Sequence, residues 1–159
     1  MERGLPVVYS FENRCKLMEK PIVWIHGDCL SPKNPALQEY PDAPAIWVWD
    51  DALLEEWQIS LKRIVFIYEC LLELPVTIRR GDVVAEVAAF SKEHGADGVA
   101  TAESPSPLFG AICDRIEDAL SLEVEIWSPE PFVDYDGYID LKRFSRYWRV
   151  AQQYVFESK

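Results

Sequence analysis

Five short, mostly apolar runs constrain the fold of this chain more than any other feature of its sequence. Each run is three to five residues long and is bounded by proline, glycine or charged residues, which is typical of strands buried on both faces of a parallel sheet. Longer segments with a helical spacing of apolar residues separate the runs. The sequence therefore predicts strands over 22–25, 45–49, 76–78, 98–102 and 124–127.

The segments between these strands carry helical patterns with recognisable ends. We expect a brief helix in the proline-rich link 28–45, one helix through Trp57 that Pro75 closes, a helix from the N-cap Asp82 to His94–Gly95, and a helix over about 108–120. Such alternation makes right-handed βαβ units. The predicted fold is three-layer, Rossmann-like α/β, with a five-stranded parallel sheet in the order 3-2-1-4-5 and helices on both faces.

Strands and helices of this pattern fall within residues 20–128, which we expect to form one α/β domain. Residues 1–19 precede it as an extension, and the apolar run Leu5–Phe11 within them could pair with a sheet edge. Residues 129–159 are expected to hold a linker and a C-terminal amphipathic helix that begins near Asp140. The length of 159 residues suits a single domain.

The net charge of −11 restricts the possible partners. Nucleic-acid binding usually needs a basic surface that neutralises phosphates, so direct DNA binding is not expected. No run approaches the roughly 20 apolar residues of a transmembrane helix. The four cysteines, Cys15, Cys29, Cys70 and Cys113, form no C-x-x-C pair. We therefore expect no metal site, reduced thiols (that of Cys70 buried) and a cytoplasmic location.

The predicted strand order also predicts a ligand site. Open parallel sheets bind small molecules beyond the carboxyl ends of their strands, where the order reverses, which is here between the first and fourth strands. The candidate ligand-binding residues at this point are His26, Asp28, Thr101, Glu103 and Ser104. Asp28 and Glu103 would repel phosphate but accept hydrogen bonds from N–H groups of a neutral heterocycle. The alternative is structural, with Asp28 capping a loop and Glu103 solvated.

The patterns of the common hydrolases and phosphate-binding proteins are missing from the sequence. There is no G-x-G-x-x-G, no Walker loop and no G-x-S-x-G. Of the two histidines, His26 is the better functional candidate, because His94 is expected to cap a helix end. The pair Asp50–Asp51 could hold Mg²⁺, but capping of the next helix is the favoured interpretation. No catalytic residue is predicted.

The last helix combines an aromatic face with a basic cluster in an otherwise acidic chain. The candidate docking residues for a protein partner are Phe144, Arg146, Tyr147, Trp148 and Arg149, because aromatic residues and arginine dominate binding hot spots. Two alternatives stay open. The aromatic face could fold back on the sheet while the arginines pair with surface carboxylates, or the helix could lie on a membrane surface.

The order of several short motifs resembles the N-terminal α/β domain of the DNA photolyase and cryptochrome family. The resemblance covers roughly residues 20–127 and rests on Ile22–Leu37 (with Asp28 and Asn34-Pro35-Ala36-Leu37), Val48-Trp49-Asp50, Ser60-Leu61, Arg79-Arg80-Gly81-Asp82, Lys92–Asp97, Glu103 and Asp114. The stretch Arg143–Arg149 is also similar to this family. The chain departs from the family near the first strand, where His26-Gly27 and Cys29 stand in place of an arginine-rich pattern.

The resemblance implies a pigment site rather than a repair site. In some family members this domain holds an antenna pigment, a pterin or deazaflavin, near its strand ends, and Glu103 matches an acidic contact to that pigment. A separate helical domain binds FAD and DNA and carries the electron-transfer chemistry. We expect this chain to lack that domain, so FAD is not expected in this chain alone.

Three functions follow as hypotheses. The first is a non-catalytic accessory module that binds a protein partner, such as a separately encoded flavin domain or a larger assembly. The alternative is a carrier of a small molecule or of a pterin, deazaflavin or flavin-like pigment. A DNA photolyase-related repair component is the third.

Overall fold

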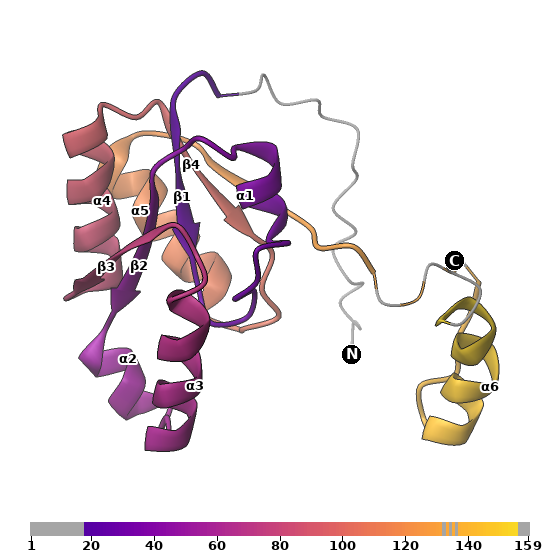
Figure 1. The fold of residues 1–159 in the computed structure, drawn as a ribbon. Coiled ribbons are helices and arrows are strands. Elements are labelled where there is room, and N and C mark those ends of the chain that lie inside the picture. Colours follow the sequence, from indigo (N-terminus) through magenta and orange to yellow (C-terminus); the bar gives the residue numbers. More distant parts are fainter. Residues whose placement is uncertain (1–17, 132, 134, 136, 156–159) are drawn as a thin grey trace, which may run out of the picture. The chain divides into compact units, whose positions relative to one another are not determined.

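The structure, a computed structural model, describes residues 18–131, 133, 135 and 137–155 (Figure 1). It divides into two compact units, Met1–Trp127 and Ser128–Lys159. The run Leu5–Phe11, expected to pair with a sheet edge, lies outside the described residues.

The first unit is built on a parallel five-stranded sheet with the predicted order, β3-β2-β1-β4-β5. Its strands are β1 (Pro21–Ile25), β2 (Ala45–Trp49), β3 (Val76–Arg80), β4 (Gly98–Ala102) and β5 (Val124–Trp127). The central strand β1 pairs on both sides, with Trp24 aligned to Ile46 of β2 and Thr101 of β4. Every residue of β1 and β4 is buried, which explains their continuous apolar sequences.

Helices cover both faces of this sheet and form two separate cores (Figure 1). On one face, α4 (Val83–His94) and α5 (Phe109–Leu120) pack on side chains that include Trp24 and Ile46. On the other face, α1 (Pro35–Glu39) and α3 (Leu61–Leu71) pack on side chains that include Val23 and Trp47. The alternation of side chains along each strand assigns neighbouring residues to opposite cores.

Short polar side chains begin these helices, as their positions in the sequence indicate. The carboxylate of Asp82 accepts a hydrogen bond from the Ala85 N–H and caps α4, which ends at Gly95 in a left-handed conformation (φ 58°). The amide oxygen of Asn34 caps α1, the brief helix expected in the first link. These caps satisfy N–H groups that have no partner inside a helix.

The single helix expected after β2 was a wrong prediction, because the structure has two. Helix α2 (Asp51–Glu56) ends at Trp57, and the next residue, Gln58, has a positive φ of 49°. The chain then restarts at Ser60, whose hydroxyl accepts the Arg63 N–H at 3.4 Å and caps α3. A left-handed residue breaks the helical path, so Trp57 lies at a helix end and is 45% exposed rather than on the inner face of one long helix. Cys70, expected to be buried on that helix, is only partly buried.

The second unit contains one helix, α6 (Phe144–Val155), among its described residues. This helix begins four residues later than the sequence indicated. The side chain of Asp140 accepts the backbone N–H of Lys142 at 3.0 Å and pairs with Arg146 at 2.5 Å. These contacts hold a turn before the helix, so the pattern read as a helical start at Asp140 belongs to that turn. No described helix is long and apolar enough to cross a membrane.

Candidate ligand-binding site

A cavity opens beyond the carboxyl ends of β1, β2 and β4, and residues of α2 and α3 also line it. The volume open to the centres of water-sized molecules is about 130 Å³. A single water needs roughly 10–15 Å³ by the same measure. The cavity therefore has room for a small organic molecule, at the position where parallel sheets bind ligands.

Aromatic side chains make up much of the cavity wall. Trp24, Trp47, Trp49, Trp57 and Phe109 all line it. Trp24 stacks on Phe109 with ring centroids 6.0 Å apart and planes inclined by 14°, whereas Trp47 and Trp49 meet edge to face at 5.3 Å. Aromatic walls of this kind favour flat, apolar ligands.

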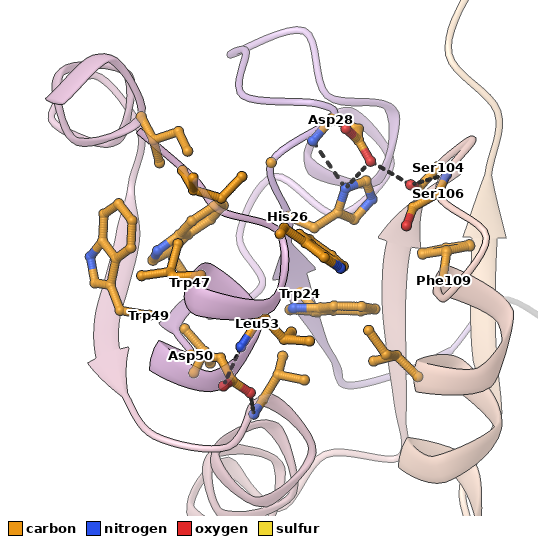
Figure 2. Close-up of a pocket in the computed structure, with 18 of the residues that line it drawn as sticks. Trp24, His26, Asp28, Trp47, Trp49, Asp50, Leu53, Ser104, Ser106 and Phe109 are labelled. Atoms are coloured by element: carbon orange, nitrogen blue, oxygen red, sulfur yellow. Dashed lines mark hydrogen bonds and ion pairs between the residues drawn. The ribbon is translucent and has the colours of Figure 1, made fainter. Parts of the chain in front are cut away.

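His26, Asp28 and Ser104 form a hydrogen-bonded polar corner on one side of the cavity, opposite Trp47 and Trp49 (Figure 2). The Ser104 hydroxyl donates to Asp28 Oδ2 at 2.5 Å, and the backbone N–H of Asp28 donates to His26 Nδ1 at 3.3 Å. His26 Nε2 lies 2.7 Å from the carbonyl oxygen of Ala102. A carbonyl only accepts, so Nε2 carries the proton and Nδ1 is the acceptor.

The corner presents a carboxylate beside a neutral imidazole. Burial lowers the pKa of His26 below its ordinary value of 6.5, although the bond to the Ala102 carbonyl and the charge of Asp28 act in the opposite direction. His26 is therefore neutral at pH 7. The side chain of Asp28 is 37% exposed, which leaves its carboxylate able to accept a further hydrogen bond from a ligand N–H.

Asp50 also lines the cavity, but its carboxylate already has partners on both oxygens. Oδ1 accepts the N–H groups of Ala52 and Leu53 and caps α2, and Oδ2 accepts the N–H of Val83 at 3.1 Å. The capping role predicted for this residue is confirmed. Among the residues that the structure describes, no three His, Cys, Asp or Glu side chains are grouped so that they could hold a metal ion.

Two further polar groups belong to cavity-lining residues and have no protein partner among the residues that the structure describes. Arg63 on α3 forms no ion pair with any described residue. The indole N–H of Trp47 is buried without a hydrogen-bond acceptor within the described part of the chain. A buried donor of this kind is rare in proteins.

The structure brings together three of the five residues that the sequence placed in a ligand site. His26, Asp28 and Ser104 line the cavity. Thr101 is fully buried, and its hydroxyl donates to the Trp24 carbonyl at 2.8 Å, while Glu103 is exposed and outside the cavity wall. Whether any of the five binds a ligand stays a prediction.

Sequence reasoning missed the side of the cavity that β2, α2 and α3 supply. Trp47, Trp49 and Asp50 lie at the carboxyl end of β2, next to the first strand, so the same rule that selected His26 could have selected them. Trp57 and Arg63 could not be placed there while α2 and α3 were taken for one helix.

No protein-family model matches this sequence, and no curated protein matches it.

Proposed function

We propose that this chain binds a small, planar, aromatic molecule in the cavity at the ends of β1, β2 and β4. The observation that carries the proposal is the combination of an aromatic wall with one hydrogen-bonding corner, Asp28 and Ser104. A fused heterocycle with N–H donors on one edge fits this chemistry, because the rings stack on tryptophan and the N–H groups meet the carboxylate.

A further polar group refines the expected ligand. Arg63 lines the cavity and offers a cation to an acidic substituent. A pterin, a deazaflavin and a flavin-like ring each combine N–H donors with carbonyl acceptors. These are also the pigments that the resemblance to photolyase and cryptochrome antenna domains implies, so the carrier hypothesis is the function we favour.

The test is a binding titration of the full chain with riboflavin, flavin mononucleotide and a pterin. Quenching of tryptophan fluorescence measures the binding. Replacing Asp28 by Asn or Ser104 by Ala is expected to weaken binding about tenfold, the effect of losing one charge-assisted hydrogen bond. Asp42→Asn, at an exposed position away from the cavity, is the matched control and should bind like the unaltered chain.

Glu103→Gln separates the cavity from the site that the family resemblance implies. Glu103 does not line the cavity, so this change is expected to leave the affinity for the ring unaltered. Weaker binding by Glu103→Gln together with unaltered binding by Asp28→Asn would contradict the cavity proposal. Absence of binding by all three ring systems would remove the pigment class.

Docking of a protein partner through α6 is the second candidate function. Phe144 is 72% exposed and stacks on Trp148 at 5.9 Å, which presents a flat aromatic surface, and the adjacent Tyr147 lies 6.1 Å from Phe144. Arg146 already pairs with Asp140, so Arg149 is the better candidate for a contact with an acidic partner. A partner that co-purifies in fixed stoichiometry and is lost with Trp148→Ala would support this function.

A further inference from the structure

Helix α3 is apolar on two sides. Its inner side buries Ile67 and Leu71 in the core. A second line of side chains faces solvent, namely Leu61 (74% exposed), Val65 (48%), Tyr68 (50%) and Leu72 (66%). The spacing of four, three and four residues places these four on one side of the helix. They are called the outer stripe. Phe66 is also exposed (61%), but it lies about 100° around the helix from Val65.

The outer stripe is apolar on the solvent side of α3, where a helix that only covers a sheet would be polar. Such a helix places polar residues on its solvent side. Single exposed apolar residues are common, but a continuous patch marks a surface that is covered in the functional molecule. The charged residues beside the stripe indicate which kind of partner covers it.

Charges beside the outer stripe are arranged against the dipole of the helix. Lys62 lies in the first turn, where negative charge is favoured, and Glu69 and Glu73 lie at the end, where positive charge is favoured. A second helix running antiparallel reverses this relation, because its carboxyl end then lies beside Lys62. The arrangement is self-complementary, which suits a two-fold symmetric contact.

We propose that α3 packs against α3 of a second copy of this chain, antiparallel about a two-fold axis between Val65 and Tyr68. Such pairing sets Leu61 opposite Leu72 of the partner subunit and Val65 opposite Tyr68 of the partner subunit. The same symmetry places Lys62 beside Glu69 of the partner subunit and Glu73 of the partner subunit, twice in each dimer. An 11-residue helix is about 16 Å long, so the interface is small, and we expect the dimer to dissociate on dilution.

Sedimentation of the full chain over a dilution series tests the proposal. The unaltered chain is expected to move from dimer to monomer on dilution, and Val65→Glu is expected to raise the dissociation constant about a hundredfold by placing a charge in the stripe. Ala89→Glu adds the same charge at an exposed position of α4 and should leave the dimer intact. The proposal is overturned if the chain is monomeric up to millimolar concentration. The outer stripe would then be covered by other segments of the same chain or by nothing.

Charge reversal identifies the partner helix. Two variants reverse the charges. One carries Lys62→Glu, and the other carries Glu69→Lys together with Glu73→Lys. Each variant creates like-charge pairs with its own copy and is expected to weaken self-association about tenfold. Mixing the two variants restores opposite charges at every pair, so a mixed dimer should form with the affinity of the unaltered chain. A dimer that survives Val65→Glu, or a mixture that forms no mixed dimer, overturns the antiparallel α3 contact.

Discussion

Helices α3 and α4 have nearly the same length, 11 and 12 residues, and both cross from one strand of the sheet to another. Yet α4 buries six side chains, including Val87 and Phe90, while α3 buries two. The residues that α4 leaves exposed are small or polar, whereas those of α3 include the outer stripe. The sequence of α4 is explained by this fold alone, and that of α3 is not.

The difference teaches that apolar spacing along a helix does not say how many surfaces the helix will contact. The pattern that places Ile67 and Leu71 on the core also places Leu61 and Leu72 on the outside. On the face of α4 and α5, one set of apolar positions meets one core. On the face of α1 and α3, apolar residues exceed what the sheet can cover.

The largest expected contrast is between two phenylalanines. Phe90→Ala empties a fully enclosed site on α4 and should lower the free energy of unfolding by about 3–5 kcal/mol. Phe66→Ala on α3 should change it by less than about 0.5 kcal/mol when measured by urea denaturation at a concentration that dissociates a dimer. Equal losses in both variants would show that α3 is covered within one copy of the chain.

Asp50 connects two helices, because its carboxylate caps α2 and also accepts the first N–H of α4, that of Val83. Asp50→Ala removes the partner of three N–H groups, two of them partly buried, so we expect a loss of about 2 kcal/mol in chemical denaturation. The neighbouring Asp51 pairs with Arg80 at the surface, and Asp51→Ala is the control with a small effect. A small effect of Asp50→Ala would mean that solvent replaces the cap.

Tyr40, at the end of α1, forms a hydrogen bond that connects this helix to Glu125 of β5. Its hydroxyl donates to Glu125 at 2.7 Å, and Tyr40→Phe should lower the free energy of unfolding by about 1 kcal/mol. Burial, with the bond to Glu125, raises the pKa of Tyr40 to about 12. Since the unfolded value is about 10, this contribution is complete below pH 10 and is lost as the pH rises toward 12. The phenylalanine variant should lack that alkaline loss.

The smallest expected effect is on the pH dependence of stability and comes from His26. Its ring centroid lies 5.4 Å from that of Phe109, on the face of α4 and α5. Burial lowers the pKa of His26 from 6.5, so the unfolded chain takes up a proton before the folded chain does. Stability is therefore complete above pH 6.5 and declines as the pH falls toward the lower folded value. His26→Gln should flatten that acid slope in thermal unfolding, and an unchanged slope would contradict the assignment.

The parts of the fold that the sequence predicted are those controlled by contacts close along the chain. Strand β1 is a run of apolar residues that stops before Gly27, and Asp82 and Gly95 define α4 by capping. The sheet order follows from these elements, because right-handed crossovers leave few alternatives. Asp28 and Ser104 line the cavity because both follow strands that meet at the reversal of strand order, and their binding of a ligand stays a prediction.

The remainder depends on features that a pattern of apolar residues does not carry. Trp57 continues the helical spacing, but the left-handed Gln58 ends the helix, and glutamine gives no warning of that conformation. Glu103 looked equivalent to Ser104 because the two are adjacent, yet only Ser104 turns toward Asp28. The direction of a side chain after a strand depends on the local turn, which the spacing of residues does not encode.

The pairing of β1 with β4 also has a consequence for how the chain folds as it is made. Thr101 binds the carbonyl of Trp24 across 77 positions of sequence, whereas β2 and β3 lie between them in the chain and pair earlier. At a synthesis rate of about 5–20 residues per second, one edge of the central strand β1 waits roughly 4–15 s for its neighbour. During that interval β1 presents an open apolar edge to the cell, so the nascent chain is most exposed to aggregation and to chaperones before residue 102 leaves the ribosome.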